Sequence, residues 1–287
     1  MKKSKISWNI THECNRQCKH CHLRSVQFPN DFSHIKWLPE QDALRVVDKL
    51  AYNGVERLGI AGGEPTLVPH LVALIEYASE ICGLELELVT NGSLIGKYIN
   101  EQQIMELSKH LSQIALSLDY SVDNPDRAWI YGRGHSQALM VKNAVNLFKK
   151  YGIYVQLKTM VFGELSPIDE LYKIAKFAQD QGIDELQLRQ YFTQSHDTYD
   201  QEDKSEESYF LESSENFKTT KEQFLQKTDT LINAFPEMNI SVVTADDMQE
   251  NYILLAPNAE LFSYGIACEP RSRIRESDSC NALYLLP

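Results

Sequence analysis

Apolar residues along the chain follow two alternating patterns: short apolar runs, and longer stretches in which apolar positions recur every three or four residues. The short runs predict strands at residues 4–10, 55–61, 84–90, 113–118, 153–162 and 183–192. The longer stretches predict helices at residues 39–53, 67–81, 102–111, 136–151 and 167–181. This alternation is typical of α/β proteins in which helices cover a parallel sheet. Right-handed crossovers would curl such a sheet into a partial (βα)6 TIM-like barrel.

The pattern changes after residue 192. Residues 193–218 are acidic and serine-rich with few apolar positions, which predicts an exposed loop. Residues 219–235 again have helical spacing, and residues 252–255 and 261–264 have β-like patterns. We therefore expect a barrel core over residues 1–192, then the acidic loop, and then a short C-terminal extension, residues 219–287, that covers the barrel.

Net charge and hydropathy narrow the possible partners. The formal net charge of -12 argues against a nucleic-acid polymer or an anionic membrane, because both need an excess of Lys and Arg. No apolar run approaches the roughly 20 residues of a membrane span, and the segment MKKSKISWNI lacks the apolar centre of a signal peptide. We expect a cytoplasmic protein with reduced cysteines. Six cysteines in 287 residues are too few for a disulfide framework.

Three of the cysteines, Cys14, Cys18 and Cys21, lie in the segment ITHECNRQCKHCHLR, directly after the first predicted strand. In a parallel barrel this is the carboxyl end of the sheet, where functional loops gather. Two kinds of metal site fit the spacing. Zinc would need a fourth ligand, which a histidine of the same segment could supply. An iron–sulfur cluster would leave one iron without a protein ligand and open to a small chelating molecule.

The second predicted strand ends in Gly62-Gly63-Glu64-Pro65. A CxxxCxxC loop followed one strand later by GGEP, within six strand–helix units, resembles the radical S-adenosylmethionine (SAM) superfamily. The resemblance implies a [4Fe–4S] cluster on Cys14, Cys18 and Cys21, with SAM as the second cofactor. It also implies reductive cleavage of SAM to a 5′-deoxyadenosyl radical that takes a hydrogen atom from a substrate. A zinc-stabilised binding protein is the alternative from another class.

The resemblance also implies SAM contacts at the strand ends. Glycines allow close backbone approach to a ligand, and Glu64 would contact the SAM ammonium group. His20 stands where the family usually has an aromatic residue against the adenine, and an imidazole face can still stack there. The other expected contacts are Asn91, Ser117, Asp119 and Arg133, the last through a bidentate pair with the SAM carboxylate.

A closer resemblance is to the viperin family, which dehydrates nucleoside triphosphates to 3′-deoxy-3′,4′-didehydro products with an antiviral role. The segments VTNGSLI, LSQIALSLDYSVDNPDRAWIYGRG and ADDMQENYILL look like that family's sequence blocks, in the same order. The resemblance implies a nucleotide substrate and an electron donor such as flavodoxin or ferredoxin. Tyr252 becomes a candidate for substrate contact or radical quenching, with a packed strand tyrosine as the other interpretation. Cys268 and Cys280 are too few for an auxiliary cluster, and we expect plain thiols.

The viperin family binds its triphosphate with basic residues on the fifth and sixth strands. At the comparable places this chain has Lys158 and Arg189, beside Gln156, Glu185 and Gln187. The resemblance therefore implies that Lys158 and Arg189 contact substrate phosphates. Because a triphosphate carries several negative charges, so few cations weaken that assignment. A radical SAM enzyme acting on a peptide, a sugar or another metabolite is the alternative.

Overall fold

The computed structural model describes residues 5–21, 36–129, 136–191, 217–247, 253–255, 257, 259 and 261–263. Its strands are β1 (Lys5–Asn9), β2 (Arg57–Ala61), β3 (Glu85–Thr90), β4 (Leu111–Ser117), β5 (Tyr154–Val161), β6 (Glu185–Gln190), β7 (Ile240–Val243), β8 (Ile253–Leu255) and β9 (Leu261–Ser263). Its helices are α2 (Glu40–Tyr52), α3 (Leu71–Glu80), α4 (Glu101–His110), α5 (Gln137–Lys150), α6 (Ile168–Asp180) and α8 (Lys221–Ala234), with the 3-10 helices η2 (Pro65–Leu67) and η3 (Pro125–Trp129).

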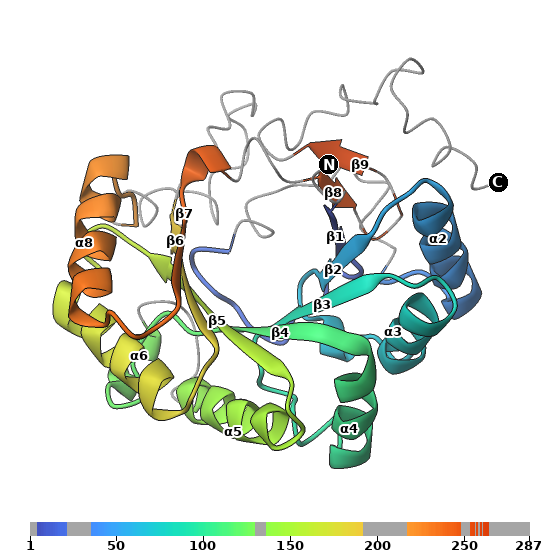
Figure 1. Cartoon of the computed structure of the whole chain (residues 1–287), viewed down its shortest axis with the longest axis horizontal. Helices are drawn as coiled ribbons and strands as arrows, with labels where there is room; N and C mark the ends of the chain where they lie inside the picture. Colours follow the sequence, from blue (N-terminus) through green and yellow to red (C-terminus); the bar gives the residue numbers. More distant parts are fainter. Residues whose placement is uncertain are drawn as a thin grey trace, which may run out of the picture.

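The strands form one sheet in the order β7-β6-β5-β4-β3-β2-β1-β8-β9. Neighbours from β7 through β1 to β8 pair in parallel, whereas β8 and β9 pair antiparallel. The sheet is curled, and the helices cover its convex side (Figure 1). The predicted fold class, a partial TIM-like α/β barrel, is confirmed.

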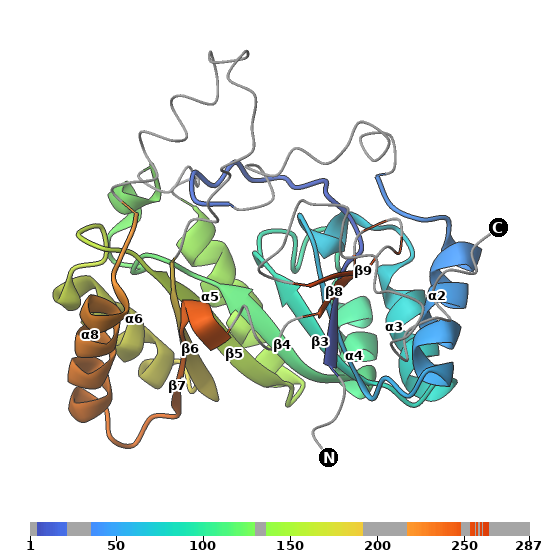
Figure 2. The same cartoon turned by 90° about the horizontal axis from the view of Figure 1, so that it is seen from above.

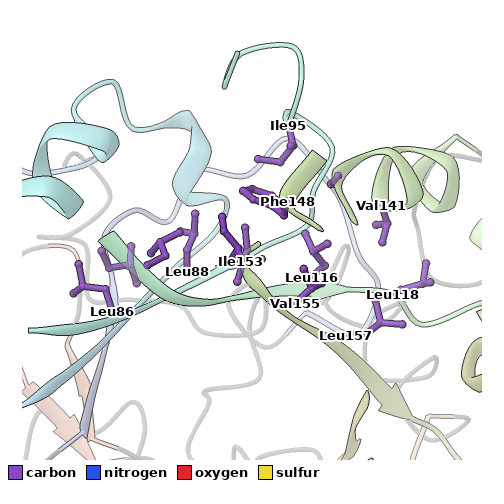
Figure 3. Packing of buried hydrophobic residues seen from close by; sticks show 14 of the residues in the cluster. Leu86, Leu88, Ile95, Leu116, Leu118, Val141, Phe148, Ile153, Val155 and Leu157 are labelled. Atoms are coloured by element: carbon purple, nitrogen blue, oxygen red, sulfur yellow. The ribbon is translucent and has the colours of Figure 1, made fainter. Parts of the chain in front are cut away.

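The two faces of the sheet differ sharply in polarity. Alternate residues of β3, β4 and β5 point toward the helices, where they pack with residues of α5 (Figure 3); the labelled members from these elements include Leu86, Leu88, Leu116, Val155, Leu157, Val141 and Phe148. Because successive side chains of a strand point to opposite faces, the residues between them lie on the concave inner face. These are Glu87, Ala115, Gln156 and Lys158, so the inner face is largely polar.

The helix predicted at residues 67–81 begins later, at Leu71. Residues Pro65–Leu67 form the 3-10 helix η2 instead, and Val68 then adopts an extended conformation with φ -77 and ψ 118. Val68 precedes Pro69, and the proline ring disfavours helical conformation in the residue before it. The turn after Glu64 is thereby kept separate from α3.

The chain after the acidic loop adds strands at both edges of the sheet. Helix α8 leads into β7, which pairs with β6 and which the hydrophobic pattern did not predict. The predicted stretches near residues 252–255 and 261–264 are confirmed as β8 and β9, with β8 beside β1. Most of the predicted acidic loop lies outside the described residues, and the predicted division into a core, a loop and an extension stays a prediction. Among the described helices, none has the length and apolar character that crossing a membrane requires.

Candidate active site

The three clustered cysteines lie on the loop that leaves the carboxyl end of β1, here called the cysteine loop (residues 10–21). None of the three forms a disulfide; Cys14 is exposed, and Cys18 and Cys21 are partly buried. The backbone N–H of Cys21 donates to the carbonyl of Cys18 at 3.2 Å, which turns the chain between these two thiols. The loop crosses above the strand ends, away from β1 (Figure 2).

The first half of the cysteine loop runs against the glycine-rich segment. The N–H of Gly63 donates to the carbonyl of Thr11 at 2.7 Å, and the N–H of Glu64 donates to that of Glu13 at 2.8 Å. A Cβ added to Gly62 would lie 2.4 Å from the Thr11 oxygen, and one on Gly63 would lie 2.2 Å from the Glu13 oxygen. Both distances are far inside van der Waals contact. The glycines are therefore required by the close approach of the cysteine loop, a reason that the expectation of ligand contact did not include.

Glu64 uses its carboxylate within the protein. The residue is 0% exposed, and its Oε1 accepts hydrogen bonds from the hydroxyls of Thr66 and Thr90, both at 2.5 Å. Its Oε2 accepts from the backbone N–H of Asn91 at 2.8 Å. Burial raises the pKa of Glu64, while these donors oppose that shift. This arrangement favours a role in fastening the glycine-rich segment to the end of β3 over the expected direct contact with an ammonium group.

Asn91 links the end of β3 to the cysteine loop. Its Nδ2 donates to Asn15 Oδ1 at 3.0 Å and lies 4.0 Å from the Cys14 sulfur. Asn15 in turn donates to Ser93 Oγ at 2.9 Å. The expectation placed Asn91 beside SAM, and the structure places it beside a cysteine. Asn15 was not singled out from the sequence, although it lies between two of the clustered cysteines.

His20 and Asp119, both expected to contact SAM, lie against each other. His20 Nε2 is 3.3 Å from Asp119 Oδ2, and Asp119 Oδ1 accepts from the backbone N–H of Met160 at 2.9 Å. The His20 ring packs on Phe162 and Phe217 at centroid distances of 4.9 and 6.1 Å. The same aromatic group includes Tyr191, at 5.2 Å from Phe162. His20 therefore ties the cysteine loop to the ends of β4 and β5.

The remaining predicted site residues divide into two groups. Ser117 lies at the end of β4, in register with Lys158 of β5. Arg133, Tyr252, Cys268 and Cys280 lie outside the described residues, and their roles stay predictions.

The two predicted phosphate-binding cations differ in their surroundings. Lys158 Nζ is 2.5 Å from Glu87 Oε1, and Glu87 Oε2 also accepts from Lys5 at 2.7 Å. Burial would raise the pKa of Glu87, but Lys158 and Lys5 together hold it well below its usual range. Arg189 lies on the inner face of β6, partly buried and in register with Met160. The expected cation at Lys158 is thus already paired with a buried carboxylate.

The protein is thus a half-barrel with a loop of three cysteines at the carboxyl ends of its strands, above a polar inner face. The profile of the radical SAM superfamily matches residues 8–178, and the chain belongs to this superfamily. The crystal structure of Streptococcus suis SuiB bound to S-adenosylmethionine has a TM-score of 0.64 and 16% identity, covering 90% of this chain and 59% of that one. That likeness confirms the fold.

Two curated relatives are similar over different lengths. An S-adenosylmethionine-dependent nucleotide dehydratase of Lacinutrix mariniflava is 25% identical over 264 residues, which is 90% of this chain and 50% of that protein. An Fe-coproporphyrin III synthase of Methanosarcina barkeri is 32% identical over 118 residues, which is 40% of this chain and 26% of that protein. This chain therefore spans about half the length of the nucleotide dehydratase.

Membership of the superfamily implies a [4Fe–4S] cluster and SAM as cofactors. The donor set fits the cluster in its chemistry, because one short loop carries three thiols and none of them is in a disulfide. Within the described ranges, no three His, Cys, Asp or Glu side chains form a closed metal site, so the fit rests on the chemistry and spacing of the thiols.

Proposed function

We propose that the protein is a radical SAM enzyme that takes a hydrogen atom from a nucleotide. One observation carries the nucleotide: the similarity to the nucleotide dehydratase covers 90% of the chain. It extends well beyond the superfamily match at residues 8–178. The similarity to the Fe-coproporphyrin III synthase, in contrast, covers 40% of the chain. The finer form of the proposal is viperin-like dehydration of a nucleoside triphosphate to a 3′-deoxy-3′,4′-didehydro product, with an antiviral role.

In this proposal the cofactors supply the chemistry and the chain supplies their positions. The [4Fe–4S] cluster, when bound, supplies the electron for reductive cleavage of SAM. Cys14, Cys18 and Cys21 would hold the cluster, and an electron donor such as flavodoxin or ferredoxin would reduce it. The contacts around Glu64 support this role, since they hold the glycine-rich segment and the cysteine loop together at the strand ends.

SAM would lie at the carboxyl end of the sheet, between the cysteine loop and the inner face. The packing of His20 on Phe162 and its pairing with Asp119 would close one side of that space and exclude water. Ser117, Asn91 and Arg133 remain proposed SAM contacts. On the substrate side Arg189 is the proposed phosphate ligand, since guanidinium groups form bidentate pairs with phosphate oxygens.

The test uses the cluster-loaded protein, prepared without oxygen and supplied with SAM and a reductant. Each ribonucleoside mono-, di- and triphosphate is added in turn, and formation of 5′-deoxyadenosine is measured beside the mass of the nucleotide. We expect one nucleotide to raise 5′-deoxyadenosine formation well above the rate without substrate and to yield a product lighter by one water. The C18A variant is the matched inactive control. If SAM is cleaved but no nucleotide stimulates cleavage or is consumed, the substrate is instead a peptide, a sugar or another metabolite.

A further inference from the structure

The inner face of the sheet carries a group of three charges, two of them shielded from water. Glu87 of β3 lies between Lys158 of β5 and Lys5 of β1, with its two oxygens at 2.5 and 2.7 Å from the two ammonium nitrogens. The side chains of Glu87 and Lys158 are 6% and 11% exposed. Lys158 is therefore held by a charge-assisted hydrogen bond in a place shielded from water, where a charged pair is hard to separate.

This pairing removes Lys158 from the set of cations that a phosphate could use. A phosphate approaching its ammonium group would also meet the Glu87 carboxylate, and two anions at one cation repel each other strongly at low effective dielectric. The two lysines keep the Glu87 carboxylate ionised, because together they hold its pKa well below the usual range against the effect of burial. The Lys158 ammonium group that faces the inner space is therefore already paired with a carboxylate, and the remaining positive charge of the group lies toward Lys5, at the other oxygen of Glu87.

Two amide oxygens lie on the strands beside this group. Gln187 of β6 is in register with Lys158, and Gln156 lies two residues before Lys158 on β5. The side-chain oxygens of both glutamines are buried and have no hydrogen-bond partner within the described part of the chain. Gln156 as a whole is 4% exposed. Buried polar atoms in proteins nearly always have a partner, so each such oxygen points to a missing donor.

The orientation of the Gln187 amide follows from its neighbours. Ser241 of β7 donates its hydroxyl to Glu185, so the serine oxygen can only accept from Gln187, whose Nε2 lies 3.5 Å away. The Oε1 atom of Gln187 is therefore the one left to accept from another molecule. The two glutamines therefore form a polar wall on the inner face, here called the acceptor wall, whose side-chain oxygens have no donor within the described part of the chain.

We propose that this acceptor wall binds an uncharged, hydrogen-bond-donating part of the substrate, and that Glu87 keeps phosphate groups away from Lys158. Hydroxyl and amino groups are the matching donors. If the substrate is a nucleotide, as the proposed function has it, the wall receives the ribose or the base, and the phosphates lie elsewhere. Glu87 is then a specificity-determining residue, and Gln156 and Gln187 are substrate-binding residues.

The first experiment measures binding of inorganic triphosphate to the cluster-loaded protein by calorimetry. The E87Q variant frees the Lys158 ammonium group, so we expect triphosphate to bind at least about tenfold more tightly than to the wild type. Added salt should weaken the gain, as it weakens any exposed charge interaction. The double variant E87Q/K158M should lose the gain. Equal affinity in the wild type and E87Q, with both folded, would overturn the exclusion of phosphate.

The K158Q variant keeps the proposal testable if E87Q does not fold. Lys158 does not hold phosphate in this proposal, so K158Q should bind triphosphate within about twofold of the wild type. A loss of tenfold or more in K158Q would show that Lys158 binds phosphate after all. Circular dichroism and iron content confirm that each variant is folded and loaded.

The second experiment tests the acceptor wall with the four uncharged ribonucleosides. The Q187M variant removes one acceptor and should weaken binding of the preferred nucleoside about tenfold, whereas Q179M, on the exposed side of α6, should not. An unchanged affinity in Q187M would remove the wall from the substrate site. If no nucleoside binds to the wild type, the acceptor wall is wrong, whereas the proposed function is decided separately by nucleotide-stimulated cleavage of SAM. The triphosphate experiment still decides the role of Glu87 in that case.

Discussion

The Oε2 atom of Glu64 accepts a hydrogen bond from the backbone N–H of Asn91 at 2.8 Å, and this contact joins two loops that are far apart in the sequence. Glu64 also orders the glycine-rich segment, whose backbone holds the start of the cysteine loop through Thr11 and Glu13. One fully buried carboxylate therefore positions the cysteine loop without touching a cysteine. We therefore expect that removing this carboxylate lowers both the stability of the protein and its cofactor content.

Replacing Glu64 by alanine would leave the donors of Thr66, Thr90 and Asn91 without their acceptor in a buried place. Unsatisfied buried groups cost about 1–3 kcal/mol each, so E64A should lower the free energy of unfolding by at least about 2 kcal/mol in urea titrations. Iron content should fall with it. E64Q keeps the shape and one acceptor, and should lie between E64A and the wild type. A fully stable, fully loaded E64A would show that the contact is dispensable.

The raised pKa of Glu64 also predicts a dependence on pH. A carboxyl whose folded-state pKa lies above its unfolded value contributes stability that is lost as pH rises through the folded value. Burial raises the pKa of Glu64 in the folded state, whereas the glutamine of E64Q does not titrate. The stability advantage of the wild type over E64Q should therefore be larger at pH 5 than at pH 8. Melting temperatures of both proteins across this range measure the difference, and a constant advantage would contradict the buried carboxylate.

The close approach at Gly63 predicts that a single methyl group displaces the cysteine loop. In G63A the new Cβ would lie 2.2 Å from the Glu13 oxygen, which is backbone and cannot turn aside. Gly59 of β2 is the matched control, because a Cβ there would meet its nearest atom, Ser7 Oγ, at 3.7 Å. We expect reconstituted G63A to hold much less iron than the wild type, and G59A to hold a normal amount. Similar iron content in both variants would contradict the role given to the approach.

These residues show which features can be predicted from sequence. The strands that alternate with helices follow from local periodicity, and all six predicted strands are present. Strand β7 was not predicted because it has only four residues, and all four are partly buried. Its residues therefore show no alternation of buried and exposed positions that a sequence pattern could reveal. The need for glycine at Gly63 was recognised, but the partner was not, because it comes from a loop about fifty residues earlier.

The site residues likewise include some that the sequence predicts and others that it does not. The cysteines were found because metal ligands have a characteristic spacing. The pairing of His20 with Asp119 was not found, since a contact between residues about one hundred positions apart leaves no local pattern. Glu87 was missed for a related reason. A glutamate within a strand looks like a solvated position, and its partners Lys5 and Lys158 come from two other strands.

The cysteine loop gives a prediction that separates iron from zinc. Replacing Cys14, Cys18 or Cys21 by alanine should abolish iron and sulfide binding and SAM cleavage, because each removes one of three thiolates. Cys82 is the control: its thiol lies 3.5 Å from Asp48 Oδ1, on the helical side of the sheet, and C82A should keep its iron. Metal analysis and the brown absorbance of the cluster provide the measurement. One zinc per chain and no sulfide in the wild type would instead favour a zinc-stabilised binding protein.

The Glu87–Lys158 pair predicts a measurable coupling in stability, independent of any substrate. Removing one partner of a buried ion pair leaves an uncompensated charge, and such changes cost about 3–5 kcal/mol. Lys5 still faces Glu87 in K158M, so that variant should fall near the lower end of this range. The double variant E87Q/K158M leaves neither charge and should cost less than the sum of the two single changes.

Urea unfolding of the four proteins in this cycle gives the coupling energy. The pKa of Glu87 is lowered in the folded state, so its stabilising effect is present above the unfolded-state value and is lost as pH falls through the range below it. The wild type should therefore lose its advantage over E87Q between neutral and acidic pH, in the opposite direction to the Glu64 pair. Strictly additive costs at neutral pH would mean that the two side chains do not interact, and the proposed exclusion of phosphate would fall with them.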